Sequence, residues 1–569
     1  MKHLPPPTQA SLADSIRRPG AGALLQLLAS MLWLPQAGLL AWAVQKMADG
    51  QGLEALWPIA AGVLLLGLLR AWCDGRGGLL ANLAARQQLS ALRAQVVNAL
   101  AQTSPMDKAR AASGQAASAV AEQAEAIVPW LARYQSAMWR VRLLPVLIVA
   151  AVLSQSWVAA LILIVAAPLI PLFMAIVGWR AQAASEEQMV QLGQMNAFLL
   201  DRLRGLSTLR ALAAVDATAQ RLRAHAEDLR SRTLRVLRIA FLSSAVLELF
   251  SALGVAMVAV YIGFHLLGML PFGAWGHQLT LGQALFVLLL APAFFEPLRE
   301  LSAVWHDRAA GEAALKTLEQ LQQQASHIVG AEALQKSEPS AQSIAAHVTV
   351  ADLNVQAPGA ATRLGRLTLE IRPGEHVALC SPSGSGKSVL LAQLVGLVAV
   401  QQGEIRIDGQ RLDDGSAAAL RARMAWMSQQ PQVFAGSVQR NVALGRSDVT
   451  AQQVEAATQQ AELGAVLQSR PGLSLGEGGA GLSGGEVVRL ALARLAVNTQ
   501  AGLLLADEPT AHLDPETAAQ VSEALIRIAK GRTLIVATHD AQLAARMDRI
   551  VQLPLQGESC EVPDTEVSA

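Results

Sequence analysis

The sequence VALCSPSGSGKS, residues 377–388, changes from apolar to small and polar residues at Ser381. Its first four residues predict a short buried strand, and the apolar stretch after Ser388 predicts a helix. The small residues between them allow backbone N–H groups to surround phosphates, while Lys387 can reach the β- and γ-phosphates and the Ser388 hydroxyl can bind Mg²⁺. Ser381 stands where such loops usually have their first glycine. We predict a phosphate-binding loop formed by Ser383, Gly384, Ser385, Gly386, Lys387 and Ser388.

A second apolar strand, LLLADE at residues 503–508, ends in two carboxylates. Asp507 is expected to hold Mg²⁺ through water, and Glu508 to polarise an attacking water as general base. For this pair alone, a strand followed by helix-capping acids is the structural alternative. The motif LSGGE at residues 482–486 lies between the two strands, and ATHD, which contains His539, follows them. Four such motifs in this order and at this spacing do not arise readily by chance.

The composition of the 569 residues indicates that part of the chain lies in a lipid membrane and part in water. Only 16% of the residues are charged, the mean hydropathy is +0.34 and the net charge is +1, whereas soluble domains average about 25% charged residues. These values exclude a disordered protein and argue against nucleic acid as a partner. The three cysteines are far apart and imply neither a disulfide scaffold nor a zinc site.

Six apolar segments, each about as long as a membrane span, account for the deficit of charge. They are residues 23–44, 55–72, 137–153, 157–179, 239–267 and 281–301. Loops 154–156 and 268–280 contain no Lys or Arg, whereas the two long intervening segments are rich in arginine. This distribution predicts that the N-terminus, both long segments and the C-terminal domain lie in the cytoplasm.

The predicted fold is an α-helical membrane domain with six transmembrane helices, followed by an α/β P-loop nucleotide-binding domain. We expect a cytosolic N-terminal segment at residues 1–20, the transmembrane domain at 21–306, a polar connector at 307–345 and the ATP-binding domain at 346–569. The first apolar run is too long for the core of a signal peptide, so we interpret Arg17 and Arg18 as an inside anchor.

With these motifs the sequence resembles the ATP-binding-cassette (ABC) transporter family, whose exporters bind ATP and Mg²⁺. The resemblance implies that Gln429, in MSQQPQVF, binds Mg²⁺ and senses the membrane domain, and that His539 contacts the γ-phosphate. It also implies that AHLD, residues 511–514, is the D-loop of the family, which includes Asp514. Ser483, Gly484 and Gly485 would bind the γ-phosphate of ATP held by a partner subunit, so the domain is expected to work as a dimer.

Four stretches of the membrane half, residues 167–178, 198–210, 237–250 and 291–300, closely resemble the CydD-type subunits of the CydDC family. This resemblance implies a heterodimeric exporter with a CydC-like partner in the bacterial inner membrane, needed for cytochrome bd assembly. The implied cargo is cysteine, glutathione or haem, and haem is also a candidate ligand. The alternatives are a homodimeric lipid or drug exporter, and a non-transporting regulator that uses ATP as a switch. Such regulators often lack the catalytic carboxylate, which is present here as Glu508.

One position departs from the ABC pattern. Where the family usually has an aromatic residue that stacks on adenine, this sequence has Ala357. By analogy with single-stranded nucleic-acid binding, losing one such stack costs about 1–3 kcal/mol. We therefore expect weak or partner-dependent ATP binding at this subunit's own phosphate-binding loop.

The membrane half offers four candidate substrate residues. Glu296 lies in the last span, where a central charge costs about 2.5–3.5 kcal/mol, and it either contacts substrate or pairs with Arg299. Arg140 and Arg142 lie near the inner mouth of the third span and either attract an anionic peptide such as glutathione or anchor the helix. His306, beside Trp305, is either a haem ligand or gate, or an interfacial residue.

Overall fold

The computed structural model describes residues 20–168, 187, 195, 198–199, 201–203, 205–276, 278–323, 326–331, 345–356, 363–382, 384–470, 472–476, 479–553 and 560–561. Several predicted features fall outside them: the N-terminal segment before Gly20, the fourth span beyond Pro168, Ala357, Ser383 and the side chain of His306.

The described residues form two compact units. The helical unit comprises residues up to Val97 and Ser113–Gln320, and the α/β unit comprises Asn98–Ala112 and the residues from Leu321 onward. The last residues of two long helices therefore belong to the α/β unit. The predicted boundaries at residues 20, 306 and 345 stay predictions.

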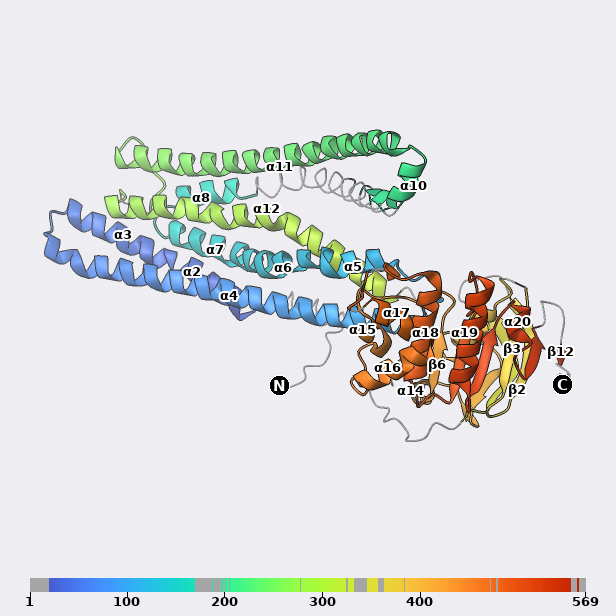
Figure 1. The fold of residues 1–569 in the computed structure, drawn as a ribbon. Coiled ribbons are helices and arrows are strands. Elements are labelled where there is room, and N and C mark those ends of the chain that lie inside the picture. Colours follow the sequence, from blue (N-terminus) through green and yellow to red (C-terminus); the bar gives the residue numbers. More distant parts are fainter. Residues whose placement is uncertain are drawn as a thin grey trace. The chain divides into compact units, whose positions relative to one another are not determined.

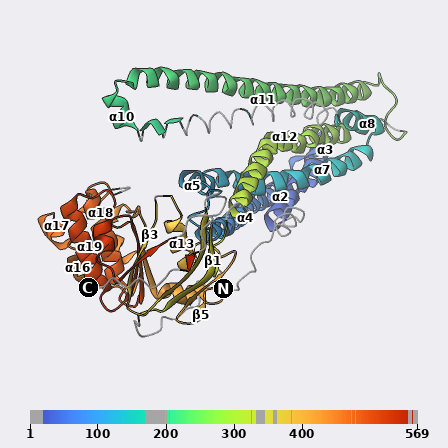
Figure 2. The ribbon, with the colours of Figure 1, turned by 90° about the vertical axis from the view of Figure 1, so that its right-hand side faces the viewer.

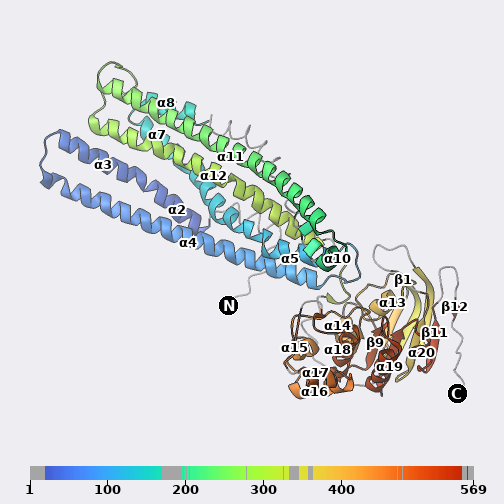
Figure 3. The same ribbon diagram turned by 45° about the horizontal axis from the view of Figure 1, so that its top comes forward.

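The helical unit is built from long helices that run side by side (Figures 1 and 3). Its α-helices are α2 (Ala21–Met31), α3 (Trp33–Ala48), α4 (Trp57–Ala101), α5 (Ser113–Ala121), α6 (Ile127–Pro129), α7 (Gln135–Leu153), α8 (Trp157–Ala166), α10 (Leu206–Ala211), α11 (Val215–Leu266) and α12 (Leu281–Gln323). In the part of the chain that the structure describes, five helical stretches are long and apolar enough to cross a membrane, and α8 is a shorter apolar helix where the fourth span was predicted to begin.

Prolines shape two of these helices. Pro35 lies in the first turn of α3 and has no N–H for the carbonyl of Met31, so the predicted first span is two helices that meet at Leu32. Helix α12 contains Pro292 and Pro297, and Figure 2 shows that it bends along its length.

Small residues bring α2 and α4 into backbone contact. A Cβ atom on Gly22 would lie 2.7 Å from the carbonyl oxygen of Gly77, so only glycine fits this crossing. On α12, Phe294 and Phe295 are buried in the core of the unit. Pro292 and Glu296, four residues apart, lie on another face of the same helix and line a cavity described below.

The α/β unit contains two five-stranded sheets. In the first, all neighbouring strands are parallel, in the order β11 (Arg549–Gln552), β3 (His376–Cys380), β10 (Thr533–Ala537), β9 (Leu503–Asp507) and β6 (Met424–Met427). Every residue of β9 and β10 is buried, as a parallel sheet covered on both faces requires. The second sheet has the order β12 (Cys560–Glu561), β2 (Arg363–Ile371), β1 (Val348–Gln356), β4 (Glu404–Ile407) and β5 (Gln410–Arg411).

Helices complete the α/β unit. They are α13 (Lys387–Leu394), α14 (Ala417–Ala422), α15 (Val438–Ala443), α16 (Ala451–Gln460), α17 (Gly464–Ser469), α18 (Gly484–Val497), α19 (Pro515–Ala529) and α20 (Ala541–Ala544), with a small hairpin of β7 (Gly436–Ser437) and β8 (Ser474–Leu475). Figure 2 shows α16 to α19 gathered on one side of this unit and β1 and β5 on the other.

The segment that follows α4 pairs with the segment that follows α12 inside the α/β unit. The N–H of Ser104 donates to the carbonyl of Ser326 over 2.7 Å. The Asp107 carboxylate accepts hydrogen bonds from both the N–H and the hydroxyl of Ser326, each 2.7 Å long. These donors, the Ser326 N–H first, hold the pKa of Asp107 below its usual range.

Residues 326–331 continue from this junction onto the helices of the α/β unit. The N–H of Val329 donates to the carbonyl of Gly396 over 2.9 Å, and Arg421 donates to the carbonyl of Val329 over 2.7 Å. The N–H of Gly330 donates to Asp414 over 2.7 Å. Residues 326–331 therefore link the loop after α4 to α13 and α14.

Candidate active site

The candidate site lies at the carboxyl ends of three adjacent strands. β3, β10 and β9 are neighbours in that order and pair in parallel register, with Ala537 opposite both Leu379 and Asp507. Loops that follow parallel strands meet at one edge of a sheet, where such folds bind ligands. The phosphate-binding loop, His539 and the two carboxylates are brought together in this way.

The loop between β3 and α13 has the expected form in its described residues. Gly384 (φ 79°) and Gly386 (φ 118°) adopt the left-handed backbone region, which favours glycine. Lys387 begins α13, and its Nζ donates to the carbonyls of Ser381 (2.8 Å) and Pro382 (3.4 Å). The Ser381 and Ser385 hydroxyls hydrogen-bond to each other. The serine in place of the usual glycine thus contributes contacts within the loop.

Glu508 lies between two basic side chains. Its Oε1 is 3.4 Å from Lys387 Nζ, and its Oε2 is 2.6 Å from His539 Nδ1. Its backbone is in the left-handed region (φ 48°), which costs a non-glycine residue about 1–3 kcal/mol. The hydrogen bond from its N–H to the carbonyl of Ala537, 2.8 Å long, holds it there. The fold therefore holds Glu508 in a strained backbone conformation just after the carboxyl end of β9, and such strain is common at functional sites.

Asp507 is a buried carboxylate with spare bonding capacity. Its Oδ1 has no hydrogen-bond partner among the described residues, and the Ser388 hydroxyl donates to the carboxylate. Burial raises the pKa of Asp507. Hard cations such as Mg²⁺ prefer carboxylate, hydroxyl and phosphate oxygens. Asp507 and Ser388 therefore fit a magnesium site beside the phosphate-binding loop.

The other predicted nucleotide residues lie on separate elements. Gln429 is exposed after β6. Ser483 caps α18, where its Oγ accepts from the N–H of Glu486 (3.3 Å) and Glu486 Oε2 accepts from the N–H of Ser483 (2.7 Å). Asp514 caps α19 by accepting from the N–H of Thr517 (3.0 Å), which lowers the pKa of Asp514. None of the contacts described for these three residues reaches Lys387 or Glu508.

The N-terminus of α18 is open to solvent. Ser483 and Gly484 are exposed, and a Cβ atom on Gly485 would lie 2.9 Å from Cγ2 of Thr517. The exposed N–H groups of this turn are available to an anion from outside the chain.

Comparison with known proteins identifies the family. The family model "ABC transporter" matches residues 364–511, and "ABC transporter transmembrane region" matches residues 20–298. The glutathione/L-cysteine transport system ATP-binding/permease protein CydD of Escherichia coli (strain K12) is 36% identical over 93% of this chain and 89% of its own length. The chain belongs to the CydDC family of ABC transporters.

Two further matches agree with this assignment. The CydC protein of the glutathione/L-cysteine transport system of Bacillus subtilis (strain 168) is 29% identical over 93% of this CydDC-family chain and 91% of its own length. A bacterial Atm1-family ABC exporter solved with ATP bound has a TM-score of 0.77 at 22% identity, and the match covers 96% of this chain and 95% of that chain. The predicted fold class is thereby confirmed. The CydDC-family chain is a multi-pass membrane protein whose ATPase domain binds ATP and drives transport.

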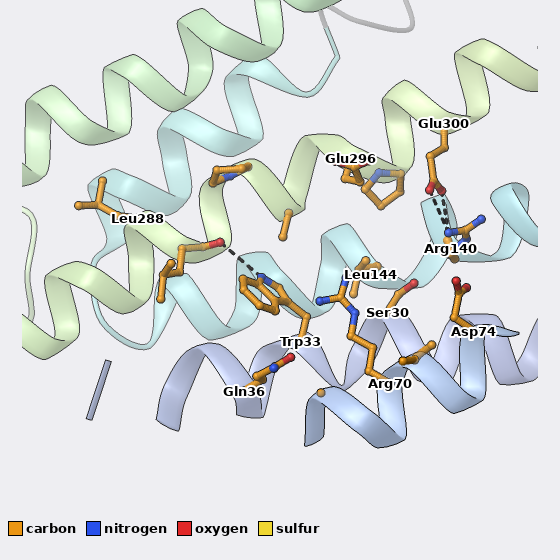
Figure 4. Close-up of a pocket in the computed structure, with 17 residues that line it drawn as sticks. Ser30, Trp33, Gln36, Arg70, Asp74, Arg140, Leu144, Leu288, Glu296 and Glu300 are labelled. Carbon is orange, nitrogen blue, oxygen red and sulfur yellow. Dashed lines mark hydrogen bonds and ion pairs between the residues drawn. The ribbon is translucent and has the colours of Figure 1, made fainter. Parts of the chain in front are cut away.

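The helical unit of this CydDC-family chain contains a cavity of about 730 Å³ between α2, α3, α4, α7 and α12. Figure 4 shows its lining, which includes Ser30, Trp33, Gln36, Arg70, Asp74, Arg140, Leu144, Leu288, Glu296 and Glu300. Two of the four predicted substrate residues, Arg140 and Glu296, therefore lie in one cavity.

Both of these residues also form ion pairs. Arg140 Nη1 lies 2.8 Å from Glu300 Oε2, and Arg299 Nη2 lies 2.8 Å from Glu296 Oε2, the alternative considered for Glu296. Arg142 is not among the lining residues, and its guanidinium lies 5.5 Å from the centre of the Trp139 ring. For His306 the structure gives the backbone within α12 only.

Sequence reasoning missed Arg70, Asp74, Trp33 and Glu300 as cavity residues of the CydDC-family chain. A signal was present, because Arg70 lies inside the apolar segment 55–72 and Asp74 follows one turn later. Ionisable residues within a span are rare and usually functional.

Proposed function

We propose that this chain is the CydD-type subunit of a heterodimeric exporter that moves cysteine or glutathione out of the bacterial cytoplasm. The observation that carries this proposal is the 36% identity to the Escherichia coli CydD protein over 93% of the chain. The arginine-rich connections support an inner-membrane orientation with the N-terminus and the ATPase domain in the cytoplasm. The partner is a CydC-like ABC subunit, and both chains lie among membrane lipids.

In this proposal the loop around Lys387 binds the phosphates of ATP. Lys387 now donates to loop carbonyls and to Glu508, so it must leave them to reach the phosphates. Its departure frees Glu508 to accept a proton from the attacking water. His539, whose side chain is 67% exposed, then turns from Glu508 toward the γ-phosphate.

Ser388, Asp507 and Gln429 would hold Mg²⁺, which offsets the charge of the phosphates when bound. The unpartnered Oδ1 of Asp507 supports this assignment. Gln429 is exposed and free to approach from its loop.

In this proposal the first turn of α18 binds the ATP that is held by the other subunit. Ser483, Gly484 and Gly485 present the open N-terminus of α18 to the partner's γ-phosphate, and Asp514 lies at the same interface. Because the donors are divided between two chains, ATP joins the two domains and hydrolysis releases them.

Haem, as ligand or cargo, stays a prediction from the family resemblance. Among the described residues there is no group of three or more His, Cys, Asp or Glu side chains placed to hold a metal ion. We carry the thiol cargo forward because the similar CydD and CydC proteins are named for glutathione and L-cysteine transport.

Co-expression tests the subunit composition and the cargo together. We expect an affinity-tagged copy of this chain to co-purify with a different ABC subunit, and inverted membrane vesicles that contain both to take up labelled cysteine or glutathione with ATP. A stable transport-competent homodimer would overturn the heterodimer. Uptake of haem without either thiol would overturn the proposed cargo.

A further inference from the structure

The cavity of the helical unit has one cation and one anion that no described residue neutralises. Arg140 pairs with Glu300, and Glu296 pairs with Arg299, which also lies 3.5 Å from Glu248. Arg70 and Asp74 have no ion-pair partner within the described part of the chain. These two residues lie four positions apart on α4, so their Cβ atoms are about 5–6 Å apart on one face of the helix.

Arg70 is held in position by an aromatic ring. Its guanidinium carbon lies 5.1 Å from the centre of the Trp33 ring, and the indole Nε1 of Trp33 hydrogen-bonds the carbonyl of Leu289 over 3.4 Å. A cation over an aromatic face is attracted to it while its N–H groups remain available. Arg70 can therefore donate two parallel hydrogen bonds to a carboxylate in the cavity.

Asp74 lies at the end of the cavity that contains the ion pair of Arg140 and Glu300 (Figure 4). In Figure 4, Asp74 and Glu300 lie on opposite sides of Arg140, and Arg70 and Asp74 both point from α4 toward α7 and α12. The carboxylate of Asp74, which has no ion-pair partner among the described residues, suits an ammonium group in the cavity.

We propose that this cavity binds the α-amino-acid head group of a small zwitterion, with Arg70 receiving its carboxylate and Asp74 its ammonium. The proposal rests on the proposed function and deepens it, because cysteine and glutathione both carry such a head group. The volume of about 730 Å³ lies within the range of small-molecule sites, about 300–1,000 Å³. Haem, which has two carboxylates and no ammonium, would leave Asp74 unmatched.

The test uses two analogues that each lack one charge. Inverted vesicles with the complete transporter take up labelled cysteine, and unlabelled cysteine, 3-mercaptopropionate (no ammonium) or cysteamine (no carboxylate) competes. A lost charge-assisted hydrogen bond costs about 1.5–3 kcal/mol, so each analogue should compete at least about tenfold less well than cysteine in the wild type. Two selectivity ratios result, one for each charge.

Variants then assign each ratio to one residue. Asp74→Asn should reduce the preference over 3-mercaptopropionate and preserve the preference over cysteamine, and Arg70→Gln should do the reverse. Arg76→Gln, an exposed arginine of the same helix outside the cavity lining, should change neither ratio. Unchanged ratios in both cavity variants, or equal losses of both ratios in each, would overturn the proposal.

Measurements on the wild-type transporter distinguish a failure of this inference from a failure of the proposed function. If a cavity variant fails to assemble, the inference is tested by the two selectivity ratios of the wild type, for cysteine over 3-mercaptopropionate and over cysteamine. Two ratios near one would overturn the inference. If the wild type transports neither thiol, the proposed cargo is wrong. Non-thiol amino acids are then tested for stimulation of ATP hydrolysis, and the inference fails if none of them stimulates it.

Discussion

Lys387 Nζ lies 3.4 Å from Glu508 Oε1, and the two side chains are only 6% and 9% exposed. The group that we propose as general base is thus neutralised by the lysine that must bind phosphate. Hydrolysis of ATP would require both residues to change partners together. Glu508 becomes available as a base only when ATP draws Lys387 away, which would limit reaction to the nucleotide-bound state.

The first prediction concerns Glu508→Gln. The amide cannot accept a proton from water, so ATP hydrolysis at this site should fall by about 10²–10⁴-fold while ATP binding is retained. Phosphate release and nucleotide binding should be measured with the partner's own general base replaced, so that only this site turns over. Glu523→Gln, an exposed change on α19, is the control. Hydrolysis within a fewfold of the wild type would remove Glu508 from the catalytic role.

Asp507→Asn should alter the dependence on Mg²⁺. Asparagine keeps the shape of the buried side chain and loses its charge, so the Mg²⁺ concentration for half-maximal hydrolysis should rise by about 10–100-fold. A magnesium titration at saturating ATP measures the shift, with the exposed Asp448→Asn as control. An unchanged midpoint with a lower maximal rate would mean that Asp507 does not hold the metal.

Gly485→Ala should strain the start of α18. The new Cβ atom would lie 2.9 Å from Cγ2 of Thr517, and overpacking of this kind costs about 1–3 kcal/mol. Thr517→Ser removes that methyl group and keeps the hydroxyl, so the double variant should recover much of the loss. Thermal unfolding of the four proteins gives the coupling. Additive losses would show that this contact does not explain the glycine.

The Asp107–Ser326 junction should make stability depend on pH. The pKa of Asp107 is lowered in the folded protein, so its contribution is fully present above the ordinary aspartate pKa of about 3.9 and is lost as the pH falls through the lowered value. Asp107→Asn should therefore lower Tm at neutral pH, and its difference from the wild type should shrink at about pH 3. A difference that stays constant between these pH values would show that the carboxylate charge does not hold the junction.

The position of the phosphate-loop and LSGGE motifs relative to strands and helices was predictable, because each motif adjoins a recognisable element. The loop around Lys387 lies between β3 and α13 as expected, and LSGGE begins α18 with a capping box at Ser483 and Glu486. The sequence does not indicate that Glu508 has a positive φ or that it pairs with Lys387. Those features depend on the register of β3, β10 and β9.

The cavity was harder to predict because its residues come from five helices. Arg140 and Glu300 are 160 positions apart and meet only when α7 packs beside α12. The predicted first span is interrupted at Leu32, and the next residue, Trp33, donates a hydrogen bond to the carbonyl of Leu289 on α12. The periodicity of apolar residues within a single helix does not indicate which side chains of different helices will be in contact.

The most direct measurement is ATP-dependent uptake of labelled cysteine and glutathione into inverted vesicles that contain this chain and its partner, compared with vesicles in which this chain carries Glu508→Gln. We predict uptake of at least one thiol with ATP, none with a non-hydrolysable analogue, and strongly reduced uptake with the variant. Equal thiol uptake by wild type and variant, or no thiol uptake by an assembled and ATP-hydrolysing transporter, would contradict the proposed function.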